Sequence, residues 1–412
     1  MSLKNFLIIF FLLFSISNSF GAMVTHNQSV TVAQPIDAQI SGIEFNEDGT
    51  KMFTSYNKRL GGDDTRFIEE YNLSTPFNIS TRVSAGDSER CKLTGVTKNA
   101  GYEIFDLEFS SDGMKFFVAQ SATNNNFATG DIVTGFNLTS PYDVSTCVFA
   151  SKTASLDFRT YTHGSQAGTY SEIMSNRRYH KVQGVEINDD GTKLFLLFSD
   201  KSDANYPDVG ARLYEFTLPT PYDVSNLWDN NRTPKSTIVT TAGIELPDTV
   251  LGANDPGGMR FTPDGKKIFI IGHESTNILQ ISLTNAYDTS SYTIDGGLNL
   301  NTGISPSNAH PRGVTFSKSG FKLYIGNDND SGTDQVMEYD LACPFNIIDE
   351  VKCPAIAKGD RTGLAIAQIE VATRTIEHST DTALNRLKWI RRNKDNQNLT
   401  NLNLDLNFTN PM

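Results

Sequence analysis

The nine residues FNEDGTKMF (45–53) return four times along the chain, as FSSDGMKFF (109–117), INDDGTKLF (187–195), FTPDGKKIF (261–269) and FSKSGFKLY (316–324). In each copy, apolar and polar residues alternate on both sides of an Asp-Gly or Ser-Gly pair. Glycine at this place supplies the positive φ that a tight hairpin requires. Each copy therefore predicts two antiparallel strands joined by a short turn.

A second phrase follows each hairpin and predicts a third strand that ends in another turn. It reads YNLSTPFNIST (71–81), FNLTSPYDVST (136–146), FTLPTPYDVSN (216–226), ISLTNAYDTSS (281–291) and YDLACPFNI (339–347). A fourth strand then completes each unit. A four-stranded unit of this size cannot bury both faces of its sheet alone, so such units stack around an axis. The sequence predicts an all-β, five-bladed β-propeller; a sixth, degenerate blade within 147–183 is the alternative.

Ring closure is also visible in the sequence. The segment QSVTVAQ (28–34) precedes the first inner strand, and we expect it to form the outer strand of the fifth blade. The repeat pattern DG-x-K-x-F … L-S-x-P-[FY]-[DN] resembles the propeller repeats of secreted bacterial proteins, which are WD40-like and lactonase-like in style. It lacks the Trp-Asp pair of true WD40 repeats. This resemblance covers about residues 28–353 and implies a fold, not an activity.

The two ends of the chain differ from the repeats. Residues 1–21 have a lysine, an apolar run from Phe6 to Ile16 and small residues after it, which is typical of a secretory signal peptide. The run is too short to cross a bilayer, which needs about 20 residues. The expected divisions are thus signal peptide 1–21, propeller 22–353, linker 354–362, amphipathic helix 363–394 and an orphan strand in 395–412.

Export makes the four cysteines disulfide candidates. Cys343 and Cys353 bracket a short loop and are the favoured pair, which leaves Cys91 with Cys147. The net charge of −12 excludes nucleic acid and anionic membrane surfaces as expected partners.

The second-to-third and blade-to-blade connections differ in every unit and should share one face, opposite the short repeated turns. This variable-loop face is where propellers usually present a binding surface. Our candidate ligand-face residues are His163, His180, His273, His310 and Arg312. Such a cluster could bind a carboxylate or act as a base, but six histidines in 412 residues also fall on loops by chance, and a catalytic role is the less favoured interpretation. No sequence motif of a known catalytic site accompanies them, so no catalytic residue is assigned.

Calcium is the only cofactor that the sequence suggests. In NDNDSGTD (327–334), Asp328, Asp330 and Asp334 have a spacing that resembles calcium loops. The loop lacks the glutamate that closes an EF-hand, and exposed turns are rich in the same residues.

The tail has two patterns. Residues 363–394 repeat apolar positions at steps of three and four, which predicts a helix, and Leu402, Leu404, Leu406 and Phe408 alternate with polar residues as in a strand. A polar helix before such a strand resembles the linker between passenger and outer-membrane barrel in autotransporters. That resemblance covers only 363–412 and implies a missing barrel as partner. Self-association through the helix, or docking of the helix on the propeller, remains open.

These observations predict an exported recognition module, displayed at the cell surface or free in the periplasm or outside the cell, with an unknown extracellular ligand or protein as partner. We lean away from an enzyme. The alternatives are a propeller hydrolase of lactonase type and a structural protein that forms homo-oligomers through its helix.

Overall fold

The computed structural model describes residues 23–32, 38–58, 66–93, 102–122, 132–153, 180–200, 211–227, 243–247, 256–273, 275–300, 309–329 and 333–348. Residues 1–353 form one compact unit and residues 354–412 another. The signal peptide, the linker, the helix of 363–394 and the terminal strand all lie outside the described residues and stay predictions. Within the described part of the chain, no helix has the length and hydropathy needed to cross a bilayer.

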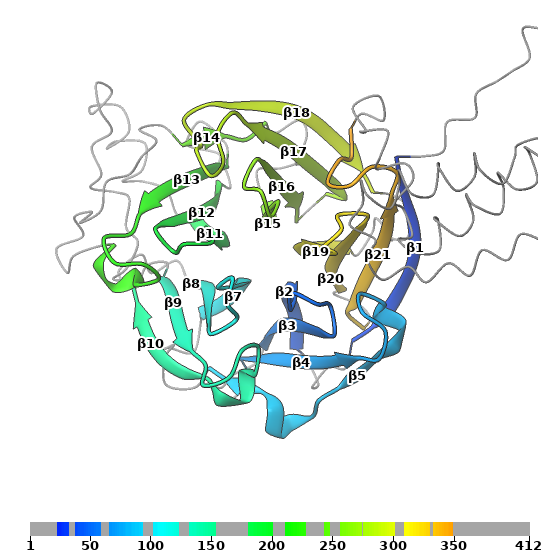
Figure 1. Ribbon diagram of the computed structural model, residues 1–412. Coiled ribbons are helices and arrows are strands. Elements are labelled where there is room, and N and C mark those ends of the chain that lie inside the picture. The colour runs from blue at the N-terminus through cyan, green and yellow to red at the C-terminus, as the bar shows by residue number, and fades with distance from the viewer. Residues whose placement is uncertain are drawn as a thin grey trace, which may run out of the picture. The chain divides into compact units, whose positions relative to one another are not determined.

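The propeller has five antiparallel sheets, here called blades 1 to 5 in chain order, each running outward from a central axis (Figure 1). Blade 1 contains β2 (Ala38–Phe45), β3 (Lys51–Lys58), β4 (Phe67–Leu73) and β5 (Arg82–Ser84), with β6 (Cys91–Lys92) also pairing with β4. Blade 2 contains β7 (Tyr102–Phe109), β8 (Lys115–Ala122), β9 (Ile132–Asn137) and β10 (Val148–Lys152). Blade 3 contains β11 (His180–Ile187), β12 (Lys193–Asp200), β13 (Arg212–Thr217) and β14 (Ile244–Glu245).

Blade 4 contains β15 (Pro256–Phe261), β16 (Lys267–Gly272), β17 (Asn277–Leu283) and β18 (Tyr292–Asn299). Blade 5 contains β19 (Ala309–Phe316), β20 (Lys322–Asn329), β21 (Gln335–Leu341) and, as its outer strand, β1 (Val24–Thr31). The five-bladed prediction is therefore confirmed. The region 147–183 supplies β10 to blade 2 and begins β11 of blade 3, instead of forming a sixth blade.

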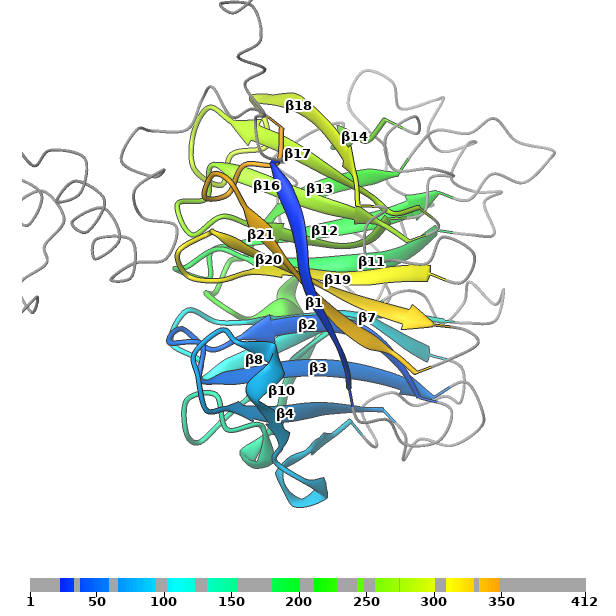
Figure 2. The same cartoon turned by 90° about the vertical axis from the view of Figure 1, so that its right-hand side faces the viewer.

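The predicted ring closure is confirmed as well. β1 pairs antiparallel with β21 from Val24 opposite Leu341 to Thr31 opposite Gln335, and both views show β1 along the outside of β21 (Figures 1 and 2). The strand begins four residues before the predicted segment. Side chains reinforce the seam, because Asn27 and Gln28 donate to the buried carboxylate of Glu338 at 2.8 and 2.7 Å.

The repeated phrases fold into two turns that lock onto each other. The glycine of each hairpin has φ between +66° and +73°, and the aromatic residue of the second turn also has positive φ. In blade 1, the backbone N–H of Phe77 donates to the Gly49 carbonyl at 2.9 Å, and the Phe77 ring covers the glycine. The equivalent pairs are Tyr142 with Gly113, Tyr222 with Gly191, Tyr287 with Gly265 and Phe345 with Gly320. Both short turns of a blade therefore lie on one face.

Three of the five motif lysines join neighbouring blades. The ammonium of Lys51 donates to the Tyr142 carbonyl at 2.9 Å in the next blade, and Lys193 reaches the Tyr287 carbonyl at 2.6 Å. Lys267 does the same to the Phe345 carbonyl at 2.8 Å. These three lysines thus anchor the locked turns of the blade that follows, whereas Lys115 and Lys322 bind Asn137 and Glu338 within their own blades.

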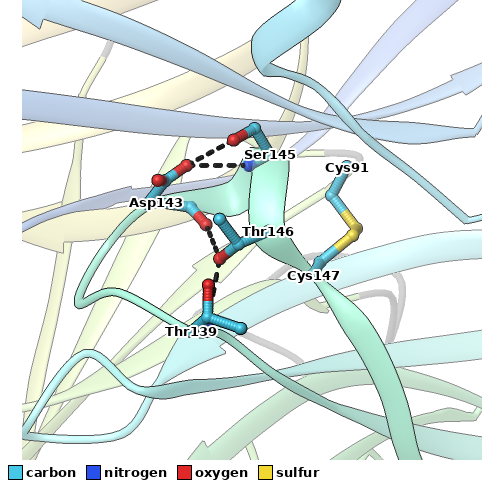
Figure 3. Close-up of a disulfide and its surroundings, with 6 residues drawn as sticks. All are labelled: Cys91, Thr139, Asp143, Ser145, Thr146 and Cys147. Carbon is cyan, nitrogen blue, oxygen red and sulfur yellow. Dashed lines mark hydrogen bonds between the residues drawn. A yellow bond between two sulfur atoms is a disulfide. The ribbon is translucent and has the colours of Figure 1, made fainter.

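A disulfide links the outer parts of blades 1 and 2. Cys91 of β6 is bonded to Cys147, whose Cα lies 5.8 Å away, as predicted (Figure 3). Cys147 follows a 3₁₀ turn (Val144–Thr146) in which the Asp143 carboxylate accepts hydrogen bonds from the Ser145 backbone N–H and hydroxyl at 3.2 and 2.6 Å. Cys343 is also oxidised to a disulfide, and its predicted partner Cys353 lies outside the described residues.

Candidate functional site at the propeller axis

The innermost strands bring one equivalent residue each to the axis, in the stretches GIEF, DLEF, GVEI, GMRF and GVTF that precede the repeated turns. The third residue of these stretches is Glu44, Glu108, Glu186, Arg260 and Thr315 in blades 1 to 5. All five side chains are buried. Together with Asp106, the three glutamates and the arginine form what we call the axial charge cluster.

Arg260 holds this cluster together across the axis. Its guanidinium pairs with Glu186 at 3.1 Å, with Glu44 at 3.3 Å and with Glu108. Glu44 and Glu108 belong to blades 1 and 2, neither of which is next to blade 4 in the ring. The arginine side chain therefore crosses the axis and closes it at this level.

The glutamates also bind backbone groups at the axis-side edge of the neighbouring blade. A carboxylate oxygen of Glu44 accepts from the Phe109 N–H at 3.0 Å, and one of Glu186 accepts from the Phe261 N–H at 3.3 Å. Asp106 accepts from the N–H groups of Leu107 and Val185 at 2.9 and 3.2 Å. The innermost strand of a blade has a free edge, and a buried N–H left unpaired there would be costly. The acids supply those partners.

Burial raises the pKa of all four acids of the cluster. Desolvation raises the pKa of Glu44 and of Asp106 to about 7 each, against the opposing attraction of Arg260. The same cause raises the pKa of Glu186 to about 8 and holds the pKa of Glu108 well above its ordinary value. One arginine faces four carboxyl groups, so the cluster keeps protons at neutral pH.

A second group of residues lies nearer the variable-loop face. The pairing register of every innermost strand shifts about three residues before its axial residue. Phe105 and Arg312 occupy this place in blades 2 and 5. The Arg312 guanidinium lies 5.8 Å from the centre of the Phe105 ring, and the Lys181 ammonium of blade 3 lies 5.6 Å from it. Because blades 2 and 5 are not neighbours, this contact also crosses the axis. We call Lys181, Phe105, Arg312 and Asp328 the mouth cluster.

The structure places the predicted ligand-face residues as follows. The rings of His273 and His310 pack together with centroids 4.8 Å apart, and His310 lies two residues before Arg312 on β19. His180 is the first residue of β11, but its side chain lies outside the described set, as does all of His163. The structure thus brings His273 and His310 together and places His310 near Arg312, while a role of these residues in ligand binding stays a prediction.

The described acids of the predicted calcium loop bind other groups of the protein. Asp328 pairs with Arg312 through Nε and Nη2, both at 3.2 Å. Asp334 is buried and accepts from the backbone N–H of Ile40 at 2.5 Å and of Asn329 at 3.1 Å. Asp330 lies outside the described residues. Among those described, no three His, Cys, Asp or Glu side chains converge as a metal site would require.

Sequence reasoning missed the axial charge cluster, Lys181 and Phe105. The sequence did contain a signal for the cluster. The third residue of the equivalent stretches GIEF, DLEF, GVEI and GMRF is charged, which covers four of the five innermost strands. Nothing in the sequence showed that these charges would meet, because the contacts span up to 216 residues.

Comparisons with known proteins give structural likeness alone. No family model and no curated protein matches the sequence. A candidate 6-phosphogluconolactonase of Bacteroides fragilis aligns with 14% identity and TM-score 0.36, over 73% of this chain and 66% of that one, just under two thirds of its length. The periplasmic gluconolactonase of Pseudomonas aeruginosa aligns with 14% identity and TM-score 0.37, over 73% of this chain and 68% of that one. A structure of the nidogen/laminin complex aligns with 10% identity and TM-score 0.34, over 70% of this chain and 72% of that one. Likeness at this level carries no argument about activity.

Proposed function

We propose that this chain is an exported, non-enzymatic recognition module that binds its partner through the variable-loop face around the axis. The observation that carries the proposal is that the acids of the described axis already form ion pairs and hydrogen bonds within the protein. Glu44, Glu108 and Glu186 bind Arg260, and two of them also bind the next blade. Asp328 and Asp334 are likewise engaged with Arg312 and with backbone N–H groups.

A hydrolase of lactonase type needs acids or bases that reach the substrate. In this ring the acids support the scaffold, and the cationic side chains of Lys181 and Arg312 pack over the buried ring of Phe105 near the variable loops. The constant turn face and the differing loops fit a rigid frame that displays a specific surface. Export is supported by the signal-like residues 1–21 and by the Cys91–Cys147 disulfide, which suits an oxidising compartment.

The test compares binding with hydrolysis on the same purified, folded protein. Immobilised protein is screened against arrays of glycans and of purified surface proteins, and lactone hydrolysis is followed by proton release. Lys181→Glu changes the loop face, and Lys318→Glu changes an exposed lysine of the repeated turns as a matched control. We expect saturable binding that Lys181→Glu weakens and Lys318→Glu does not. Saturable lactone hydrolysis that is lost in Lys181→Glu alone would contradict the proposal and favour the enzyme.

A further inference from the structure

Neighbouring blades share a repeated hydrogen bond, in which the preceding blade donates to the carbonyl of the aromatic residue in the second turn. A motif lysine is the donor to Tyr142, Tyr287 and Phe345, at the interfaces of blades 1 with 2, 3 with 4 and 4 with 5. At the interface of blades 5 and 1 the donor is the Tyr324 hydroxyl, which reaches the Phe77 carbonyl at 2.5 Å. This interblade hydrogen bond is therefore present at four of the five interfaces.

The interface between blades 2 and 3 lacks this bond among the residues that the structure describes (Figure 1). The carbonyl in question belongs to Tyr222, and none of the described side chains donates to it. The motif lysine of the preceding blade, Lys115, donates to Asn137 of its own blade at 2.6 Å instead. Its ammonium therefore does not join the two blades.

A buried acceptor is missing at the same interface. In blade 3, a carboxylate oxygen of Glu215 on β13 accepts the backbone N–H of Thr289 in blade 4 at 2.8 Å. In blade 2 the residue at the same place is Gly135 on β9, which has no side chain that could accept a hydrogen bond. A Cβ at Gly135 would meet the Phe117 ring at 2.9 Å, so the packing here favours glycine.

Apolar packing and weaker polar contacts hold blades 2 and 3 together. Val224 is fully buried in a cluster that includes side chains of both blades. The Ser111 hydroxyl donates to the exposed Asp189 carbonyl at 3.0 Å, and the Val185 N–H donates to Asp106 at the axis. The other interfaces also have apolar clusters, so the missing ammonium bond is what distinguishes this one. Hydrogen bonds from a charged donor are about twice as strong as neutral ones.

We propose that the ring opens first between blades 2 and 3, so that this interface is a hinge built into the propeller. Opening separates Lys181 of blade 3 from Phe105 of blade 2, whose ring centre lies 5.6 Å from the Lys181 ammonium near the variable loops. The hinge thus changes the shape of the loop face without unfolding a blade. In the recognition module this movement fits the face to its partner, a consequence that rests on the proposed function.

Thiol labelling of buried cysteines measures how often each interface opens. Val224→Cys probes the interface of blades 2 and 3, and Ile79→Cys probes the equivalent turn position at the interface of blades 5 and 1; both native side chains are fully buried. Each full-length variant, with its disulfides intact, reacts with N-ethylmaleimide in native conditions, and mass spectrometry follows the labelling. Each rate is divided by that variant's unfolding equilibrium constant from urea denaturation. We expect Val224→Cys to react about tenfold faster than Ile79→Cys, or more, because local opening precedes global unfolding.

Two further substitutions test the interblade hydrogen bond itself. Tyr324→Phe removes only the donating hydroxyl and should speed the labelling of Ile79→Cys by about threefold or more. Lys115→Met is the matched control and should leave the labelling of Val224→Cys unchanged, because the described contacts of Lys115 stay within blade 2. Val133→Cys, buried on the blade 2 side of the same interface, replaces Val224→Cys if that variant does not fold.

Three results would overturn the inference. Labelling of Val224→Cys that is no faster than that of Ile79→Cys would show that blades 2 and 3 separate only in global unfolding. Unchanged labelling of Ile79→Cys in Tyr324→Phe, or faster labelling of Val224→Cys in Lys115→Met, would remove the interblade hydrogen bond as the cause. Neither measurement involves a ligand, so the hinge and the proposed function can fail separately.

Discussion

Five non-glycine residues in the part of the chain that the structure describes have a backbone conformation that such residues seldom adopt. Phe77 has φ +57°, and its equivalents in the other blades, Tyr142, Tyr222, Tyr287 and Phe345, lie between +50° and +60°. This conformation costs about 1 kcal/mol or more per residue. It persists because the ring lies on a glycine and the N–H reaches that glycine's carbonyl. The glycine is needed twice, once for its own positive φ and once because a Cβ would meet the ring at 2.2–2.4 Å.

We expect Gly49→Ala to destabilise the propeller by about 2 kcal/mol, since alanine is strained at this φ and meets the Phe77 ring. Phe77→Ala should relieve the collision. In a double-mutant cycle by urea unfolding, the double variant should therefore be more stable than the two single losses added together. Strict additivity would show that the ring does not restrict the glycine.

At the scale of elements, the motif lysines explain why the repeat is more than a turn signal. Lys193 is 28% exposed and pairs at 2.8 Å with Glu215, which is fully buried. Glu215 also accepts from the backbone and hydroxyl of Thr289 in the next blade, at 2.8 Å each. Removing the lysine would leave a buried carboxylate without its countercharge.

Lys193→Met should lower the free energy of unfolding by about 1–2 kcal/mol, a figure reduced from the usual loss at buried pairs because the lysine is partly exposed. The control is Lys318→Met, whose ion pair with Glu47 is exposed on both sides and whose loss should stay within about 0.5 kcal/mol. Chemical denaturation measures both. Equal losses in the two variants would refute the role of the motif lysine between blades.

The Cys91–Cys147 disulfide closes a loop of 56 residues, so loop entropy alone assigns it about 4 kcal/mol. Cys91→Ser/Cys147→Ser should unfold at a clearly lower urea concentration than the wild type. Because Cys343 is also in a disulfide, reductant should still destabilise this variant, but by less than it destabilises the wild type. A variant that unfolds at the same urea concentration as the wild type would show that blades 1 and 2 need no covalent link.

For the whole molecule, the axial charge cluster makes stability depend on pH. Folded Glu44, Asp106 and Glu186 have pKa values of about 7, 7 and 8, well above those of free carboxyl groups. The folded state thus holds protons that the unfolded chain has released. The contribution of these protons to the free energy of unfolding is complete below about pH 4 and is lost as pH rises through 7 and 8.

We predict that the free energy of unfolding falls by more than about 1 kcal/mol between pH 5 and pH 9, where one pKa unit corresponds to about 1.4 kcal/mol. Glu44→Gln/Glu186→Gln should flatten this fall, because amides carry no proton to lose. Asp48, Asp112, Asp190 and Asp288 have lowered pKa values through hydrogen bonds in their turns, and their contribution is lost only below about pH 4. Stability that rises from pH 5 to pH 9 would contradict the account.

The sequence predicted the ring well and its centre poorly. Asp-Gly turns, alternating strands and the early strand of β1 are local signals that repeat, so five copies gave the blades and their closure. The same repetition hid Glu44 and Arg260, which look like ordinary charged strand residues one blade at a time. His273 and His310 were singled out because histidines are few in the sequence. Phe105 stood out only through its contacts with Arg312 across the axis and with Lys181 in the neighbouring blade.

The pairing of β1 with β21 sets the order in which this protein can be completed. Asn27 and Glu338 touch across 311 positions of the chain, so the first strand to leave the ribosome must wait for one that is made 311 positions later. Until then blade 5 lacks its outer strand, and loop-closure entropy opposes the seam. A chain cut between β18 and β21 would keep the strands of blades 1 to 4 but could not close the ring. The ring can therefore close only after the chain has been synthesised through β21.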